Sequence, residues 1–268
     1  MARLTHFTKS YLSLVETGKR PAGPEIMAAY GRVLGSVATR VPSVDELAGT
    51  LAATRKLEDE TSAAHVLPSV HAQRRLADNL PSSPIATGLA SEIEQYLGWL
   101  HIPQGAWREA EQHLNTAAVL ALQADDPQRL AVALSFQSYR ALEVDDLPVA
   151  EALNEAALRD TRVDPGLRAY MQIQQAEVLA LRGNRHAAAK TLAEADRLLE
   201  NLPDAEELPA SSYWYTPAVL LGHKGFVLDA LGDRSAARQA ASDSLALMPD
   251  SWSDSEWAVK HRRLAEGR

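Results

Sequence analysis

The chain contains no cysteine among its 268 residues. This excludes disulfide scaffolds, thiolate zinc sites and cysteine nucleophiles, and it agrees with a reducing compartment. No run of 18 or more apolar residues is present, and the first residues lack the charged head and apolar stretch of a secretory signal peptide. We therefore expect a cytoplasmic protein that has no membrane partner.

Strand signals are scarce as well. No stretch alternates β-branched and polar residues between Asn-Gly or Asp-Gly turns, which is the pattern that predicts a β-hairpin. Good helix formers dominate instead, and apolar residues recur at spacings of three and four, as in Ile93, Leu97 and Leu100. The sequence therefore predicts an all-α fold.

Charge is unevenly distributed along the chain. Residues 1–40 contain six lysines and arginines and two glutamates, which gives them a net charge of +4. Because the whole chain has a net charge of −8, residues 41–268 carry −12. A basic head therefore precedes an acidic body. The body argues against binding of a polyanion, whereas the head is compatible with it.

Motifs of catalysis and metal binding are missing. We find no phosphate-binding glycine loop, HExxH motif, nucleophile elbow or pair of catalytic carboxylates. The runs Glu58-Asp59-Glu60 and Asp125-Asp126 fit solvated charges at helix ends. Although the chain has eight histidines, none shows the spacing of three or four residues that places two ligands on one helical face. We expect no enzyme, no cofactor and no metal site.

An internal repeat is present. Four segments share a turn followed by an alanine at a fixed position, and these alanines are Ala110, Ala150, Ala188 and Ala237. Twelve residues before each alanine stands a small residue, namely Gly98, Ser138, Ala176 and Gly225. A small residue on each of two antiparallel helices lets them approach closely, and a glycine at the turn lets the backbone reverse direction. The pattern predicts four helical hairpins.

These spacings resemble the tetratricopeptide repeat, which has a small residue near its eighth position, an alanine near its twentieth and a proline at its end. Pro249 stands at that last place. The shared alanines are 40, 38 and 49 residues apart, which is longer than the period of that family. The resemblance implies a solenoid of degenerate repeats over residues 83–268, ending in a cap. An irregular alanine-rich bundle is the alternative.

Two segments of low apolar content divide this region. We interpret Asn79 to Gly88 as a domain boundary and Asn201 to Ser212 as a longer loop between helices. Residues 41–82 are then connecting helices between the basic head, residues 1–40, and the repeats.

Residues 7–35 predict two short helices joined by a basic turn. Thr8 is a suitable N-cap, Gly18 ends the first helix and Pro24 begins the second. The apolar stripe of the first helix consists of Tyr11, Leu12 and Val15, and it can pack on Ile26, Tyr30 and Val33.

The string Ser-Tyr-Leu-Ser, then Val-Glu, Gly-Lys-Arg-Pro and Pro-Glu, resembles the second half of the helix-turn-helix domain of Xre/Cro/phage-repressor regulators. In that family the matched helix is the recognition helix, and the basic turn contacts the DNA backbone. The resemblance implies that double-stranded DNA is contacted by Thr8, Lys9, Ser10, Ser13, Lys19 and Arg20. The order of a helix-turn-helix head and a repeat domain also resembles actinobacterial regulators.

The head departs from that family because a complete domain has one and a half further helices where this chain has only Met1 to His6. Two explanations stay open: a start assigned too far downstream, or a truncated relative that has lost DNA binding. The sequence thus predicts a DNA-binding transcriptional regulator, or a truncated relative of one. A scaffold of repeats for protein interaction that does not bind DNA is the alternative.

Aromatic residues make up only 6% of the chain, so their grouping is informative. Tyr213, Trp214 and Tyr215 lie close to Trp252 and Trp257 around the last repeat. These residues either pack the terminal hairpin or belong to a groove for a protein, peptide or small-molecule effector. The expected groove residues are Tyr96, Trp99, Tyr139, Tyr213 and Trp214, with Trp107 as a further candidate. A homodimer is left open.

Overall fold

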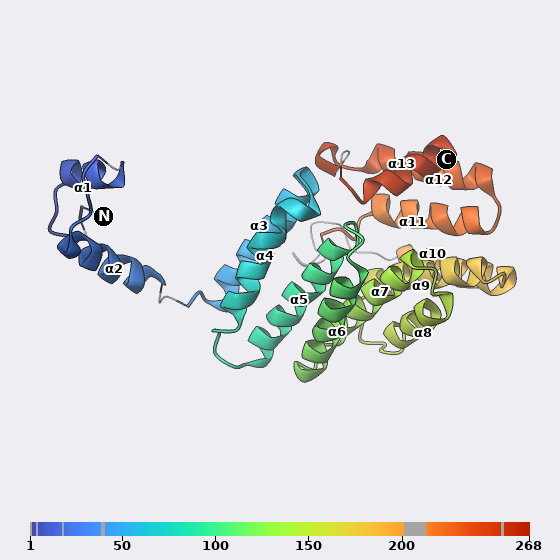
Figure 1. Cartoon of the computed structure of the whole chain (residues 1–268). Coiled ribbons are helices and arrows are strands. Elements are labelled where there is room, and N and C mark those ends of the chain that lie inside the picture. The colour runs from blue at the N-terminus through green and yellow to red at the C-terminus, as the bar shows by residue number, and fades with distance from the viewer. Residues whose placement is uncertain (1, 4, 18, 39–40, 201–212, 253–254) are drawn as a thin grey trace. The chain divides into compact units, whose positions relative to one another are not determined.

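The computed structural model describes residues 2–3, 5–17, 19–38, 41–200, 213–252 and 255–268 (Figure 1). Within these ranges the chain forms thirteen α-helices and one short 3-10 helix and has no strand, so the prediction of an all-α fold is confirmed. The expected loop at 201–212 and the expected helix stop at Gly18 lie outside the described residues.

The chain divides into unit 1, Met1–Ser43, and unit 2, Val44–Arg268. Unit 1 contains α1 (Lys9–Glu16) and α2 (Pro24–Ala38). Thr8 caps α1 as predicted, because its hydroxyl accepts a hydrogen bond from the Tyr11 amide at 3.3 Å. Leu12, Ile26 and Ala29 are buried, which gives these two helices a small apolar core.

Unit 2 consists of the other helices: α3 (Val44–Glu60), α4 (Ala63–Ala77), α5 (Pro84–His101), α6 (Trp107–Gln123), α7 (Pro127–Glu143), α8 (Leu147–Ala157), α9 (Pro165–Leu181), α10 (Arg185–Leu199), α11 (Pro217–Ala230), α12 (Arg234–Leu247) and α13 (Ala258–Glu266), with the 3-10 helix Asp250–Trp252. Polar N-caps start many of them, because a side-chain oxygen accepts an amide hydrogen bond that the first turn leaves unpaired. These caps include Ser83, Asp126, Asp164, Thr216 and Asp233. Proline follows directly in α5, α7, α9 and α11, where its missing N–H has no cost.

Consecutive helices pair into the four predicted hairpins, α5/α6, α7/α8, α9/α10 and α11/α12. The residues that reverse the chain have positive φ angles, and they are Gly105, Asp145, Gly183 and Gly232. Asp145 adopts φ +61° where the other three hairpins use glycine, a conformation that aspartate tolerates better than most residues.

The predicted close contacts lie inside these hairpins, and all four shared alanines are 0% exposed. The Ser138 hydroxyl donates a hydrogen bond to the Ala150 carbonyl at 2.9 Å. A Cβ added to Gly98 would lie 2.5 Å from Cγ of Leu114, so no larger residue fits there without displacement of α6. The small residues therefore set the spacing of the paired helices.

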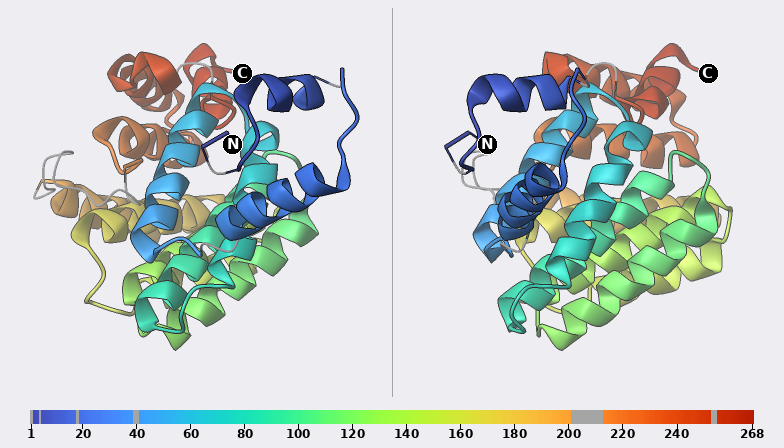
Figure 2. Two further views of the ribbon diagram at one scale, coloured as in Figure 1. Left: turned by 90° about the vertical axis from the view of Figure 1, so that its left-hand side faces the viewer. Right: turned by 60° about the vertical axis from the view of Figure 1, so that its left-hand side comes forward.

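Helices α3 and α4 share a hydrophobic core with α5, in which Leu51, Val70, Ile93 and Leu97 are fully buried. We expected residues 41–82 to connect two domains, with a boundary at 79–88. The structure instead places residues 44–82 in the same unit as the hairpins, because the apolar faces of α3 and α4 cover α5. The hairpins then follow one another in space in chain order, and α13 packs on α11 and α12 (Figures 1 and 2).

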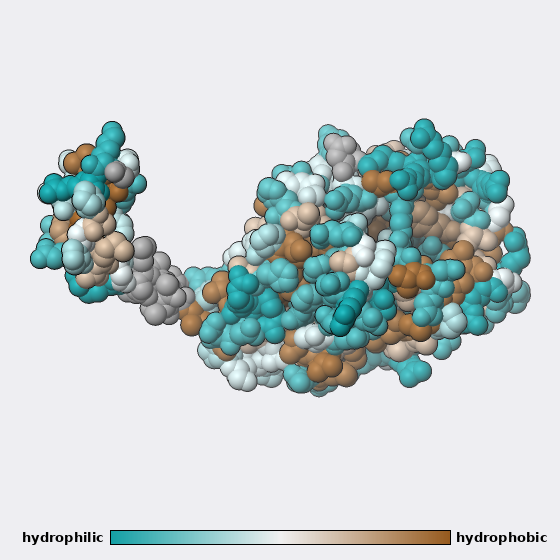
Figure 3. Space-filling view, viewed as in Figure 1, coloured by the Kyte–Doolittle hydropathy of each residue, from teal (hydrophilic) through white to brown (hydrophobic). Residues whose placement is uncertain are grey.

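The surface is mixed in character. On the face that Figure 3 shows, hydrophobic residues form separate small patches among hydrophilic ones. None of the helices in the described ranges is both long and apolar enough to cross a membrane.

Candidate functional site

All five expected groove residues line one cavity in unit 2. Tyr96 and Trp99 come from α5, Tyr139 from α7, and Tyr213 and Trp214 from the segment before α11. The further candidate, Trp107, begins α6 and is not part of the lining. The cavity has a volume of ≈ 90 Å³, which is room for several waters or for a small organic group.

The aromatic rings of this cavity contact one another mostly edge to face. Trp99 packs against Phe136 with ring centroids 5.5 Å apart, and Phe136 in turn packs against Trp214 at 5.7 Å. Trp214 also meets Tyr170 at 5.0 Å. Because each ring is held by the next, the walls of the cavity are rigid and present aromatic faces and edges to whatever enters.

One side of the cavity is bounded by a contact that joins the two ends of unit 2. The indole Nε1 of Trp252 donates a hydrogen bond to Oδ2 of Asp59 at 3.1 Å, and the Ser255 hydroxyl donates to the Asp59 carbonyl at 3.0 Å. Glu256 accepts a hydrogen bond from the Ala63 amide at 3.2 Å. The C-terminal segment therefore returns to α3 and α4, which lie more than 190 residues earlier in the chain.

Sequence reasoning missed the acidic side of the cavity. We expected Glu58 and Asp59 to be solvated, but they are only 6% and 5% exposed and line the cavity beside Arg55. The reason is tertiary: the C-terminal segment covers the end of α3, where an isolated helix would expose both carboxylates. Glu60 is exposed, as expected.

Burial raises the pKa of Glu58 to about 8, with a further contribution from the nearby charge of Asp59. Burial also raises the pKa of Asp59 to about 6, although hydrogen bonds from Tyr213, Trp252 and Trp257 act in the opposite direction. Uncharged side chains thus donate hydrogen bonds to both carboxyl groups. The Tyr96 hydroxyl, for example, donates to Oε2 of Glu58 at 3.4 Å. Among the described residues neither carboxylate forms a salt bridge.

The two cationic residues of the lining are paired elsewhere. Arg55 donates to Oε1 of Glu92 at 2.6 Å, and its guanidinium lies 5.1 Å from the centre of the Tyr96 ring. Lys260 pairs with Glu143, and its ammonium lies 5.2 Å from the centre of the Tyr139 ring. Neither cation therefore pairs with Glu58 or Asp59 within the described residues.

Two neutral imidazoles complete the lining. Burial lowers the pKa of His223 to about 3 and that of His261 to about 4, so both rings are uncharged near neutral pH. His261 is 2% exposed, and neither of its ring nitrogens has a hydrogen-bond partner within the described residues. It packs directly against Gly222, where an added Cβ would lie 2.0 Å from its ring. A ligand in the cavity could satisfy these nitrogens.

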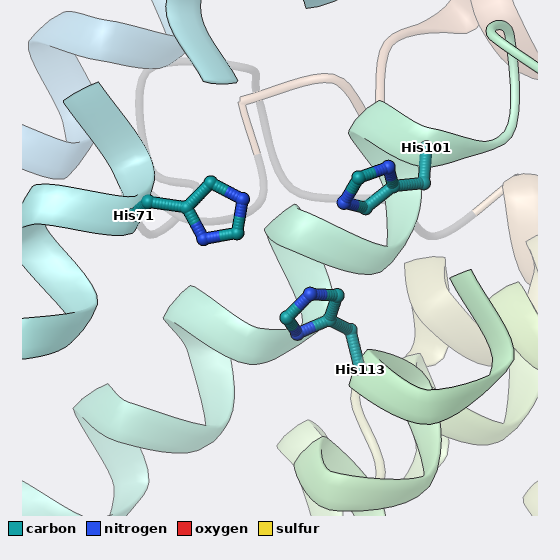
Figure 4. A group of neighbouring side chains, drawn as sticks. All are labelled: His71, His101 and His113. Carbon is teal, nitrogen blue, oxygen red and sulfur yellow. The ribbon is translucent and has the colours of Figure 1, made fainter. Parts of the chain in front are cut away.

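A second group of side chains lies in the same unit. His71 of α4, His101 of α5 and His113 of α6 point toward one another (Figure 4), and one nitrogen from each lies within 4.8 Å of the others. The expectation of no metal site rested on spacing along single helices. That test could not find this cluster, because each ring comes from a different helix.

The residues that the family resemblance implies for DNA contact are all in unit 1. Thr8, Lys9, Ser10, Ser13, Lys19 and Arg20 are all exposed. Lys9, Ser10 and Ser13 lie on α1, whereas Lys19 and Arg20 lie in the turn that follows. The guanidinium of Arg20 lies over the Tyr11 ring, 4.4 Å from its centre, so the basic turn is held against α1.

Comparisons with known proteins add no identification, since no family model, curated protein or solved structure matches the chain.

Proposed function

We propose that the protein is a transcriptional regulator in which unit 2, a set of tetratricopeptide-like hairpins, binds a small organic cation in the aromatic cavity. One observation carries the proposal: Glu58 and Asp59 are buried among aromatic rings without a cationic partner. Burying a carboxylate in this way is costly unless another charge compensates for it. Aromatic faces attract cations as well, so the rings and the carboxylates select the same ligand charge.

The repeat assignment is supported by the packing inside the hairpins. Gly98, Ser138 and Gly225 each lie opposite the shared alanine of the next helix, at the offset that the repeat family uses. In repeats of this kind the first helices of the hairpins line the inner face. Tyr96, Trp99 and Tyr139 come from such first helices, which agrees with a ligand site on that face.

The ligand test uses choline and its uncharged analogue 3,3-dimethyl-1-butanol, which has the same shape without the charge. Four of the five tryptophans line the cavity, so tryptophan fluorescence reports on binding. We expect choline to change the fluorescence and the neutral analogue to bind at least tenfold more weakly. Equal affinity for both compounds would contradict the proposal.

Matched variants separate the cavity from the surface of the same helix. Glu58→Gln should reduce the preference for choline over the neutral compound, because it removes one of the two carboxylates. Glu60→Gln should leave that preference unchanged, since Glu60 is exposed two residues away on α3. A Glu58→Gln variant with the wild-type preference would place the cation elsewhere.

The affinity for choline should rise with pH. The pKa of Asp59 is about 6 and that of Glu58 is about 8, so the cavity gains negative charge between pH 5 and pH 9. Binding of 3,3-dimethyl-1-butanol should not follow this trend. Titrations of both compounds at three pH values give the comparison.

Unit 1 supplies the DNA contact in this proposal. Its support is the exposure of Lys9, Lys19 and Arg20 on one short helix and its basic turn. We expect the chain to bind random duplex DNA with an affinity that falls as the salt concentration rises. The double variant Lys19→Ala/Arg20→Ala should reduce the slope of log K against log salt by about 0.9 for each phosphate contact that is lost. Lys56→Ala, an exposed change in unit 2, is the control. An unchanged slope in the double variant would favour the interaction scaffold.

A further inference from the structure

We propose that His71, His101 and His113 form a binding site for one divalent transition-metal ion, Zn²⁺ in the first place, and that Glu94 orients His113. The site is separate from the aromatic cavity, and the inference does not depend on the ligand proposed for that cavity. Imidazole nitrogens are preferred ligands of Zn²⁺, Co²⁺, Ni²⁺ and Cu²⁺, and three of them are a known set of protein ligands for zinc.

The three rings converge from helices that pack side by side. The ring centroids of His71 and His113 are 5.8 Å apart, those of His71 and His101 6.1 Å, and those of His101 and His113 5.4 Å. Figure 4 shows all three imidazoles directed into the space between α4, α5 and α6. Packing alone does not explain this, because partly buried positions rarely collect three imidazoles of which two, His71 and His101, have no partner for their nitrogens within the described residues.

His71 and His101 have no such partners. Within the described residues their contacts are with other histidine rings, and no hydrogen bond of their ring nitrogens is present. His101 is 9% exposed, and His71 is half-buried. At least one lone pair on each of these rings is thus available for a metal.

Glu94 provides the second element of a metal site. Its Oε2 lies 2.6 Å from Nδ1 of His113, and its other oxygen is held by Arg74. Because Arg74 donates to one oxygen of Glu94 and the other oxygen faces Nδ1 of His113, Nδ1 donates the proton and Nε2 keeps its lone pair. A carboxylate that orients a histidine in this way is typical of zinc sites.

The helix end at His101 also favours a cation, against the positive charge of Arg75 near His71. His101 is the last residue of α5, where the carbonyl groups of the helix end carry partial negative charge. Arg74, the nearest arginine to Glu94, is neutralised by Glu94 and Asp78.

The geometry needs only a small adjustment. With Zn–N distances of 2.0–2.1 Å and tetrahedral angles, two ligand nitrogens lie roughly 3.4 Å apart. The nitrogens here lie within 4.8 Å of one another, so no pair has to close by more than about 1.4 Å. Small rotations of the side chains achieve this. Three protein ligands leave the fourth position of the ion to a water molecule or an added ligand.

The first experiment is titration of the full chain with ZnCl₂, followed by calorimetry, and with CoCl₂, followed by visible absorption. We expect one equivalent of Zn²⁺ to bind and Co²⁺ to give the intense visible bands of a tetrahedral site. Absence of a single tight equivalent, or the weak bands of octahedral Co²⁺, would overturn the proposal.

Variants assign the ligands. His101→Gln and His113→Gln should each weaken Zn²⁺ binding at least 100-fold, and Glu94→Gln should weaken it about 10- to 100-fold through the loss of the orienting carboxylate. His65→Gln is the matched control, since His65 is exposed on α4 six residues from His71. Wild-type affinity in the two ligand variants would overturn the assignment, as would an equal loss in the control.

Melting temperatures test the site even in variants that fold poorly without metal. Saturating Zn²⁺ should raise the melting temperature of the wild-type chain and of His65→Gln, because an ion that binds only the folded state stabilises it. The same addition should raise the melting temperature of His113→Gln by much less, whatever its starting value, because the weakened site binds less Zn²⁺ at the same concentration. A rise of equal size in His113→Gln would show that Zn²⁺ binds at other residues.

Discussion

Two pairs of poorly exposed carboxylates in unit 2 have opposite electrostatic environments. Glu92 and Glu94 of α5 face arginine and histidine, and their pKa values are held below the usual range by Arg55, Arg129, His113 and Arg74 despite burial. Glu58 and Asp59 of α3 face only uncharged donors, and burial raises their pKa values. Burial is similar in the two pairs, so the difference comes from the partners.

In our proposal this difference separates a structural role, that of the α5 carboxylates, from a ligand-binding role, that of the α3 carboxylates. The α5 carboxylates link neighbouring helices, since Glu92 joins Arg55 of α3 to Arg129 of α7 at 2.6 and 2.9 Å. The α3 carboxylates form no salt bridge among the described residues, although Asp59 accepts a hydrogen bond from the Trp252 indole, and they cost free energy when ionised. Strongly shifted groups in a cavity are characteristic of functional sites. Three substitutions test this division.

The largest effect is expected from Arg55→Met, which removes a cationic partner of Glu92 and leaves a buried charge less compensated. Loss of one member of a buried ion pair costs about 3–5 kcal/mol of unfolding free energy, and the remaining partner Arg129 favours the lower end. Urea unfolding followed by circular dichroism measures it. Arg162→Met, which breaks the exposed pair with Asp160, is the control and should leave the midpoint unchanged. If Arg55→Met loses no more unfolding free energy than Arg162→Met, the pair of Arg55 and Glu92 does not stabilise the fold.

The second expectation concerns Glu58→Gln and pH. The pKa of Glu58 is 4.5 as an unperturbed side chain and about 8 when folded, so the folded chain holds an extra proton between these pH values. The unfolding free energy of the wild-type chain therefore falls as pH rises through this window. Glu58→Gln should lack this fall, and it should gain on the order of 3–5 kcal/mol over the wild type between pH 4 and pH 9. Parallel pH profiles for the two proteins would show that Glu58 is not desolvated.

The smallest effect is expected from Ala110→Leu, which tests the helix packing on which the positions of both pairs of carboxylates depend. Helix α5 packs on α6 through Gly98 and Ala110, and a leucine there would overpack the hairpin at a cost of about 1–3 kcal/mol. Thermal unfolding measures the loss. Asn115→Leu, on an exposed face of α6, is the control. A neutral Ala110→Leu would mean that α5 and α6 are less closely packed than this hairpin indicates.

Much of the local structure was predictable from the sequence. Thr8 caps α1 and Pro24 begins α2, as their capping preferences indicate. The offset of twelve residues between small residues placed Ser138 against Ala150 in one hairpin. These features depend on residues close in the chain, whose spacing along a helix or across one turn is set by backbone geometry.

Long-range packing decided the rest. The location of Glu58 inside a cavity follows from Trp252 and Ser255, which lie more than 190 residues further along the chain and cover the end of α3. The division of the chain at Val44, in place of one near residue 82, follows from the core that α3 and α4 share with α5.

The sequence by itself determined an all-α chain of paired helices and five of the aromatic residues that line its cavity. Helix periodicity, caps and small-residue spacing are local properties, so one sequence is enough to read them. Only the tertiary structure brought His71, His101 and His113 together from three helices and buried two carboxylates among aromatic rings. The partners of a side chain across helices depend on how the helices cross and on which surfaces the rest of the chain covers, and neither is written in the spacing of neighbouring residues.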